Sequence, residues 1–472
     1  MDTNFKNLIN KYHPVEWLAK SIERTRKRNL SDLSNTINLS SRTEFLVILS
    51  DIALRVSQNE KLYGKIPTDN EFMNFINFYI NTEANKFSNL IEEYGILSLP
   101  LYVHEQNKYI YPEMNLIGRM LILYREYEKD IETLIGLKIN DILAILLELK
   151  GQYDDKEFFI FQEETISYDK LDILTSAKIN KFLNYFSITI KDYKLKLKEL
   201  GFDKNKLYSF RLLERYPIIK IDHRYIVPSI DNLSYSLTFN LNIHLLEHYA
   251  NICKGGKYHD TLGYHFENYI EKLSKYVFKD ITPSSEIVPK DTLNSEFVIK
   301  YDDSSIAVEV KKFNFRRDSA FKNSIEDLDE LSQRHLVKAF AQIETTLKYV
   351  TTTNNFGIIV IFGDLNMHSM VKDYLQKEYP IYKKENGEKI NLEYPDNIII
   401  MSVGTYESLL SNSPEDIFKI IKTYLAKEKN QRGDILQTIS AMGKEVTHQL
   451  LKDTYQEVFD SFELEKYHTE ME

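Results

Sequence analysis

The sequence predicts an α+β protein, in which a mostly helical N-terminal part precedes a C-terminal part built around a mixed sheet. Up to about residue 210, apolar residues recur at helical spacing. From Thr261 onward, helical patterns alternate with apolar runs of strand length. The two most apolar runs, Phe356–Phe362 and Ile398–Val403, have the length of buried strands and are too short to cross a membrane.

The composition is that of a globular protein with more than one core. A chain of 472 residues is too long for one ordinary core, so we expect two or three domains. The single cysteine, Cys253, excludes a disulfide framework and a cysteine-rich zinc module, and it fits a reducing, cytoplasmic location. The N-terminus lacks the charged-then-apolar order of a signal peptide, so no membrane partner is expected.

Residues 1–210 are predicted to form a helical domain that recognises the substrate or a partner. Within Glu71–Ile80, the side chains of Phe72, Phe75, Ile76 and Tyr79 follow one face of a helix. Similar patterns predict helices over Leu116–Tyr127 and Ile131–Leu149, and Phe186–Leu200 is expected to be another helix or an extended charged segment.

Residues 211–254 are predicted to be a β-hairpin followed by a helix that connects two domains. Two short apolar runs flank Asp222–Arg224, which is typical of a hairpin, and Leu233–Tyr249 has a helical pattern. The segment Lys254–Asp260 is the best candidate for a linker, because its paired glycines support helix and strand poorly.

Residues 255–430 are predicted to form a second domain, in which helices cover a mixed sheet. Its expected elements are a helix, a hairpin, and then helices alternating with strands: Leu262–Phe278, residues 296–311, Leu328–Val350, Phe356–Phe362, Val371–Tyr379, Asn397–Val403 and Pro414–Lys427. Residues 431–472 are predicted to form a helical, acidic tail that packs on the domain or binds a partner.

The hairpin at residues 296–311 carries the most informative side chains of the chain. Glu309 and Lys311 are two residues apart in a predicted strand, so they leave the same face of the sheet. Glu296 opens the preceding strand, thirteen positions before Glu309. Two carboxylates and an ammonium group brought together in this way predict a divalent-metal site for phosphodiester hydrolysis.

Glu296 and Glu309-Val310-Lys311 resemble the core motif of the PD-(D/E)XK restriction-endonuclease-like superfamily, over roughly Thr261–Phe362. The resemblance implies a restriction-endonuclease-like α/β domain and a Mg²⁺ or Mn²⁺ cofactor. It also implies a glutamate from the helix before the hairpin and a glutamine from the helix after it. The implied catalytic residues are Glu296, Glu309, Lys311 and Gln342, and the implied metal ligands are Glu267, Glu296, Glu309 and the backbone carbonyl of Val310.

The chain departs from the superfamily pattern at three points. Glu296 occupies the place of the usual aspartate, and no proline precedes it at the usual position. A tyrosine often follows the glutamine by four residues, whereas this chain has Thr346 there.

The expected function is a metal-dependent nuclease, with DNA favoured over RNA as the nucleic-acid partner. An effector of prokaryotic anti-phage defence or restriction is the expected role, acting as a homodimer or with a partner protein. Two alternatives stay open: a catalytically degenerate nucleic-acid-binding module, and a scaffold subunit of a defence complex. The net charge of −10 argues against broad electrostatic binding of nucleic acid but leaves room for a local basic groove.

Two basic segments are candidates for contacts with nucleic acid. Lys312, Arg316 and Arg317 follow the motif and are predicted to bind the nucleic-acid backbone, with interleaved phenylalanines available for base stacking. A solvated loop is the alternative interpretation. A second basic run, Ser21–Arg28, has the pattern of a solvated helix face that could widen a DNA-binding surface.

A competing motif lies at His244-Leu-Leu-Glu-His248, which matches the H-x-x-E-H pattern of some zinc peptidases. Its two histidines could share a Zn²⁺ ion, with Glu247 as general base, but no third ligand stands out in the sequence. The alternative is an amphipathic helix that packs through Leu245 and Leu246.

Overall fold

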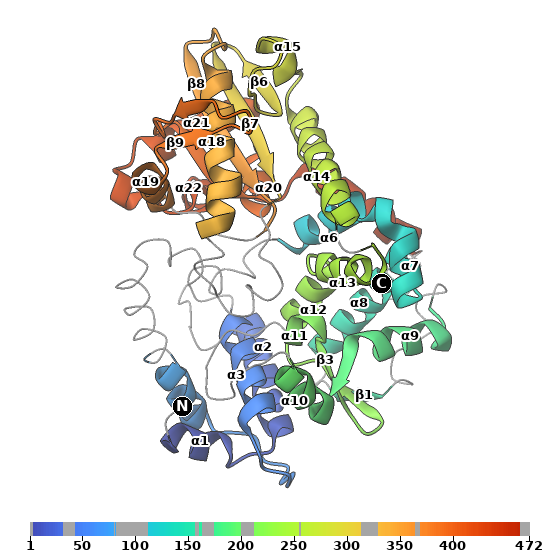
Figure 1. Ribbon diagram of the computed structural model, residues 1–472. Coiled ribbons are helices and arrows are strands. Elements are labelled where there is room, and N and C mark those ends of the chain that lie inside the picture. Colours follow the sequence, from blue (N-terminus) through green and yellow to red (C-terminus); the bar gives the residue numbers. More distant parts are fainter. Residues whose placement is uncertain are drawn as a thin grey trace. The chain divides into compact units, whose positions relative to one another are not determined.

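The computed structural model of the chain is shown in Figure 1. It describes residues 3–31, 43–79, 81, 112–155, 160–162, 174–199, 212–253, 256–312, 329–363 and 369–462. The chain divides into two compact units, each assembled from separate stretches of sequence. Unit 1 comprises Met1–Lys86, Arg119–Gly255 and Tyr455–Glu472, and unit 2 comprises Phe87–Gly118 and Gly256–Thr454.

Unit 1 is mostly helical, as the sequence predicts. Its helices are α1 (Thr3–Ile9), α2 (Pro14–Ser31), α3 (Thr43–Val56), residues 69–79, the later part of α6 (Glu113–Leu123), η3 (Arg125–Tyr127), α7 (Glu128–Ile135), α8 (Ile139–Asp155), α9 (Ser176–Phe186), α10 (Ile190–Glu199), α11 (Leu212–Arg215), α12 (Ile230–Leu237) and α13 (Leu241–Cys253). One of its cores gathers Trp17, Leu49, Phe72 and Phe75, which include the apolar face predicted for residues 71–80.

Unit 1 also contains a small four-stranded sheet that the helical pattern did not predict. Its strand order is β1 (Ile160–Gln162), β4 (Arg224–Ile226), β3 (Ile218–Ile221) and β2 (Ser187–Thr189). The predicted hairpin is present as β3 and β4, with Asp222 at a φ of 53° in the turn. Because both strands pair with strands from elsewhere in unit 1, residues 212–253 are an integral part of that unit.

Several local predictions need correction. Ile131–Leu149 is not one helix, because α7 ends at Ile135, before Gly136 with a φ of 79°, and α8 begins at Ile139. Phe186–Leu200 is not one helix, because β2 separates α9 from α10. Leu233–Tyr249 is divided between α12 and α13. The predicted linker Lys254–Asp260 contains the boundary between the two units, but it is helical from Gly256, where α14 begins. Glycine weakens a helix interior, but Gly256 is the first residue of α14, where backbone N–H groups have no intrahelical partner in any case.

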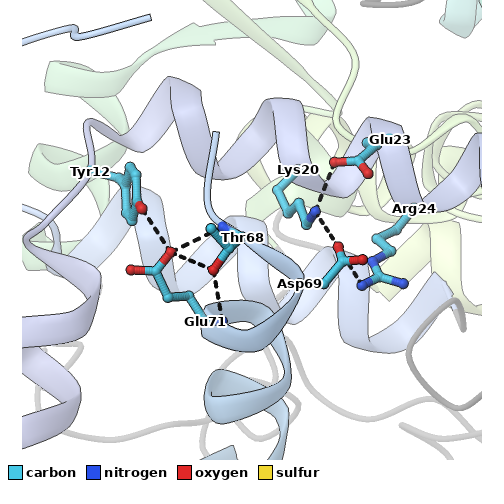
Figure 2. A network of polar contacts seen from close by, with 7 residues as sticks. All are labelled: Tyr12, Lys20, Glu23, Arg24, Thr68, Asp69 and Glu71. Carbon is cyan, nitrogen blue, oxygen red and sulfur yellow. Dashed lines mark hydrogen bonds and ion pairs between the residues drawn. The ribbon is translucent and has the colours of Figure 1, made fainter. Parts of the chain in front are cut away.

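Arg24, in the basic run Ser21–Arg28, and the preceding Lys20 are tied into unit 1 by ion pairs; the side chains of residues 25–28 are outside the described ones. Figure 2 shows Asp69 accepting from Lys20 at 2.6 Å and from Arg24 at 2.7 Å, while Glu71 binds Tyr12 and Thr68. Arg24 is buried and also lies 5.1 Å from the centre of the Phe72 ring. Its guanidinium therefore joins α2 to the helix at residues 69–79, so the solvated-face prediction is wrong for this residue.

Unit 2 is built on a five-stranded mixed sheet. The strand order is β11 (Ile398–Ser402), β8 (Asn354–Ile361), β7 (Ser304–Lys311), β6 (Phe297–Tyr301) and β5 (Asp280–Pro283). The strands β5, β6 and β7 run antiparallel, and β7, β8 and β11 run parallel. In the tight turn between β6 and β7, Asp302 has a φ of 51°, which aspartate tolerates better than most residues.

Helices cover both faces of this sheet. On one face, Val298, Ala307 and Ile359 share a core with α18 (Lys338–Leu347), which runs across the strands in Figure 1. On the other face, Phe418 of α21 (Pro414–Leu425) lies against Tyr301 and Phe356. The remaining elements of unit 2 are α14 (Gly256–Val277), α15 (Ser284–Ile287), η5 (Ser332–Val337), α19 (Ser369–Glu378), the β9 (Ile381–Lys383) and β10 (Lys389–Asn391) hairpin, α20 (Val403–Leu409), η6 (Lys429–Gln431) and α22 (Ile435–Ala441).

The C-terminal tail is helical as predicted, in α22 and α23 (Gln449–Ser461), up to the last described residue, 462. Its first part packs within unit 2 against the start of α6. Asn115 donates to the carbonyl of Val446 at 2.9 Å and accepts from the N–H of His448 at 3.2 Å. A segment predicted to belong to the N-terminal domain therefore completes unit 2.

The predicted fold class is confirmed: the chain is α+β, with a helical N-terminal half and a C-terminal half that contains the mixed sheet. None of the helices in the described part of the chain combines the length and the apolar character that a membrane crossing requires.

Candidate active site

The predicted motif residues come together at one end of the five-stranded sheet, where β7 ends and β6 begins. Lys311 closes β7 and pairs with Ile361 at the end of the parallel strand β8. Ala307 faces α18. Glu309 and Lys311 follow it at intervals of two residues along β7, so they lie on the same face of the sheet. In sheets with parallel strands, ligands bind outside the carboxyl ends of the strands, and this is such an end.

Glu296 lies one residue before β6. Phe297, the first residue of β6, pairs with Val308 of β7. If the same register continues by one residue, Glu296 lies opposite Glu309. The backbone N–H of Glu296 donates to the carbonyl of Val308 at 3.0 Å, which fixes the residue at the end of the strand pair. Burial raises the pKa of Glu296, and the positive charges of Lys311 and Lys338 oppose that shift.

Glu309 is fully buried and only half satisfied. The Lys311 ammonium donates to its Oε1, whereas its Oε2 is buried without a hydrogen-bond partner among the described residues. Burial raises the pKa of Glu309 to about 8; Lys311 lowers it, and the carboxylates of Glu296 and Glu267 raise it further. The three carboxylates therefore repel one another within a poorly solvated site.

Glu267 reaches the site from α14. The neighbouring Phe266 packs edge-to-face on Phe362, just after β8, with ring centres 5.0 Å apart. Burial raises the pKa of Glu267 to about 7, the charge of Glu296 adds to the shift, and Lys311 opposes it. The helix before the hairpin thus brings a third carboxylate to the same group of charges.

Gln342 supports the backbone that leads to Glu296. Its amide nitrogen donates to the carbonyl of Asn294 at 2.8 Å, and its Oε1 is buried without a partner among the described residues. One turn further along α18, Thr346 accepts from the N–H of Ser295 at 2.9 Å through its hydroxyl oxygen. The expected contact of Gln342 with water or phosphate stays a prediction; its Oε1 is an acceptor, so this atom could bind a water O–H but not a phosphate oxygen.

A group of basic side chains at the start of α18 was not predicted from the sequence. His335 is half-buried in η5, and its charge neighbours are Arg334, Lys311, Lys338 and Lys312. The signal that could have found Lys338 is its spacing, because it precedes Gln342 by four residues and so shares a helix face with it.

The predicted nucleic-acid contacts are described only in part. The Lys312 ammonium lies 5.5 Å from the centre of the Tyr258 ring on α14. Burial lowers the pKa of Lys312 to about 8, and the charge of Asp260 opposes that shift. Arg316, Arg317 and the interleaved phenylalanines lie outside the described residues.

Whether these residues fit a divalent metal can be judged from the donors they offer. As they stand, no group of three His, Cys, Asp or Glu side chains in the described ranges is arranged to hold a metal ion. The chemistry of the donors nevertheless suits Mg²⁺: carboxylate oxygens converge, one of them is buried without a partner, and their mutual repulsion calls for a cation. Val310, whose carbonyl is an expected ligand, lies between Glu309 and Lys311 and pairs with Val360.

The residues of the zinc-peptidase motif have structural partners. His244 is buried, with its Nδ1 at 3.1 Å from the Tyr185 hydroxyl, and burial together with the charge of Arg215 holds its pKa well below the usual value. Glu247, the general base of that interpretation, forms an ion pair with Arg215 at 3.1 Å. Leu245 is buried, as the packing interpretation expects, while His244 Nε2 is buried without a hydrogen-bond partner among the described residues, and zinc binding stays an untested alternative.

Comparison of the chain with protein-family models, with curated proteins and with solved structures gives no match in any of the three. The functional argument therefore depends on the site itself.

Proposed function

We propose that this protein is a metal-dependent nuclease that hydrolyses phosphodiester bonds, with DNA favoured over RNA as substrate. The observation that carries the proposal is the buried Glu309 carboxylate, with one oxygen on Lys311 and the other without a partner among the described residues. Burying such a group is costly, and structures keep unsatisfied buried charges mainly where function needs them. The resemblance to the PD-(D/E)XK superfamily supports the proposal, as does the mixed sheet that carries the motif.

Each side chain has a distinct role in this proposal. Glu296 and Glu309 would hold the metal, with Glu267 and the Val310 carbonyl as further oxygen donors. A bound Mg²⁺ or Mn²⁺ ion supplies charge neutralisation at the scissile phosphate and a lower pKa for its bound water. Lys311 would orient the attacking water or stabilise charge on the phosphate. Gln342 and Thr346 would hold Glu296 in place through its neighbouring backbone.

A cleavage screen tests the proposal. Double-stranded DNA, single-stranded DNA and RNA would each be incubated with the full chain and Mg²⁺ or Mn²⁺, beside Glu309→Gln and Lys311→Met. Both variants should lose at least about a hundredfold in rate, because each removes a group that acts on the reacting phosphate. Glu286→Gln, which changes an exposed glutamate on α15, is the matched control and should cut like the wild type. Absence of metal-dependent cleavage on all three substrates would contradict the proposal.

One observation favours a second candidate, a nucleic-acid-binding module that does not cut. Lys311 neutralises Glu309 directly, and no metal-holding trio is formed within the described ranges. This candidate predicts salt-dependent binding of DNA without cleavage and no uptake of Mn²⁺. Titration of the protein with Mn²⁺, followed by electron paramagnetic resonance, separates the two: the nuclease binds the ion and Glu309→Gln weakens that binding.

The biological setting follows from the same proposal. A nuclease unit joined to a separate helical unit suits a cytoplasmic effector of anti-phage defence or restriction, in which unit 1 would recognise the substrate or a partner. This is an argument from fold analogy, and it depends on the cleavage result.

A further inference from the structure

The carboxylate site is bordered by basic side chains from three different elements. Lys312 follows Lys311 at the end of β7, Arg334 and His335 belong to η5, and Lys338 begins α18. The charges of Lys311 and Lys338 also act on Glu296, so this basic group adjoins the carboxylates. In a chain with a net charge of −10, such a local concentration of positive charge stands out.

The backbone at η5 is unusual in a way that concerns the same residues. Ser332–Val337 is a π-helical turn that leads directly into α18. Such turns are rare and occur frequently at functional sites, because they re-aim side chains that a regular α-helix would place differently. Arg334 and His335 lie in this turn, and Arg334 and Lys338 are exposed.

The charges that act on His335 come from four basic side chains. Burial lowers the pKa of His335 to about 4, and Arg334, Lys311, Lys338 and Lys312 all add to that shift. Acidic groups act on part of this set: Glu309 binds Lys311, Glu296 interacts with both Lys311 and Lys338, and Asp260 interacts with Lys312. Lys311 belongs to the carboxylate site, whereas Arg334 and Lys338 are exposed beside it on η5 and α18.

We propose that four side chains form a subsite for a phosphate group of the substrate, beside the scissile phosphate: Lys312, Arg334, His335 and Lys338. This inference rests on the proposed nuclease function and assigns three residues, Arg334, His335 and Lys338, that the sequence motif does not contain. Nucleic-acid phosphates are commonly bound by such donors: an arginine guanidinium, two ammonium groups and an imidazole N–H. The subsite would position the strand so that the next phosphate lies at the carboxylates.

Binding measured without metal separates this inference from catalysis. Single-stranded oligothymidylate, with either a 5′-phosphate or a 5′-hydroxyl end, would be titrated into the full chain in the presence of EDTA. Lys338→Met and Arg334→Gln remove exposed charges from the subsite. Lys348→Met, at the exposed C-terminal end of the same helix, is the matched control. Equal binding of the two oligonucleotides assigns the subsite to a backbone phosphate, and a preference for the phosphorylated end assigns it to a terminal one.

We expect Lys338→Met to weaken binding by up to about fivefold, the effect of one exposed charge pair. The slope of log affinity against log salt should fall by about 0.7 for each phosphate of the single strand that the variant no longer neutralises. The ring signals of His335 in the NMR spectrum, assigned by their disappearance in His335→Gln, should shift on binding in the wild type.

Two outcomes would overturn the subsite: equal affinity and salt slope for Lys338→Met and Lys348→Met, or His335 signals that do not move on binding. Neither result would affect the nuclease proposal if the wild type cleaves. Conversely, the expected binding pattern in a protein that cuts no substrate would support the subsite as a nucleic-acid contact while the nuclease proposal fails.

Discussion

Burial and two neighbouring carboxylates destabilise the charged form of the Glu309 carboxyl group. It is fully buried, its pKa is raised to about 8, and its Oε2 has no partner among the described residues. In the unfolded chain the same group has a pKa near 4.5, so between these two pH values the folded protein holds the extra proton. Stability from this group is therefore complete below the unfolded pKa and is lost as the pH rises through the folded pKa.

This direction of the pH dependence of stability gives a prediction for the metal-free protein. The free energy of unfolding of the wild type should fall from about pH 5 to about pH 9 more steeply than that of Glu309→Gln, whose amide does not titrate. Urea unfolding in EDTA across this range measures both slopes. Mn²⁺ should restore stability mainly at the high-pH end, because the metal needs ionised ligands. Parallel slopes for wild type and variant would contradict the prediction.

Thr346 is a second residue whose role is visible only in its contacts. Its hydroxyl accepts from the backbone N–H of Ser295, directly before Glu296, and its own O–H donates to the carbonyl of Gln342 at 2.9 Å. Thr346→Val keeps the shape but leaves a buried N–H without a partner, which should cost about 1–3 kcal/mol of stability.

If that contact positions Glu296, Thr346→Val should also raise the Mn²⁺ concentration needed for half-maximal binding, and Thr346→Ser, which keeps the hydroxyl, should restore it. Metal titration followed by electron paramagnetic resonance gives this readout. A loss of stability with unchanged metal affinity would show that the threonine only supports the fold.

At the scale of elements, the site depends on how closely α18 approaches the sheet. At Gly357 in β8, an added Cβ would lie 2.5 Å from Ile343 Cγ2 of α18 and 2.9 Å from Ile398 Cγ1 of β11. The strand can approach both neighbours only because this position has no side chain. The same packing places Gln342 and Thr346 on the backbone before Glu296.

Gly357→Ala should therefore destabilise the protein by about 1–3 kcal/mol, the usual cost of overpacking a core. Gly151→Ala is the control with the opposite expectation: nothing lies within 4 Å of its added Cβ, and alanine should stabilise α8 by up to about 1 kcal/mol. Thermal or urea unfolding of both variants checks the pair. A neutral Gly357→Ala would mean that α18 can shift without cost.

At the scale of the whole molecule, unit 2 depends on a segment far away in the sequence. Asn115 at the start of α6 makes two hydrogen bonds with the chain before α23, to Val446 and from His448. Gly118 packs on Leu451, where an added Cβ would lie 2.7 Å from its Cβ. A fragment that begins at Gly256 would lack all of these contacts.

Asn115→Ala in the full chain tests this dependence. It leaves the buried N–H of His448 without its partner, which should cost about 1–3 kcal/mol, whereas the carbonyl of Val446 keeps its bond from the Ser408 hydroxyl at 3.1 Å. Urea unfolding gives the size of the effect, and Asn59→Ala, which removes a surface contact in unit 1, serves as control. Unchanged stability in Asn115→Ala would show that α6 contributes little to unit 2.

The sequence alone determined the fold class and the position of the motif. Strand pairs are read from a period of two and from turn residues, which are local, so the hairpin from Glu296 to Lys311 could be predicted. The buried strands β8 and β11 could also be predicted, because strands that are covered on both faces have continuous apolar sequences of this length.

Only the tertiary structure decided what lies around the motif. The contacts of Gln342 with Asn294, of Thr346 with Ser295, and of Asn115 with Val446 join residues that are far apart in the chain, and no periodicity encodes them. The pKa of Glu309 is likewise a property of its surroundings, since burial and neighbouring charges set it. The local pattern specified which residues could do the chemistry, and packing between distant segments specified the environment in which they would do it.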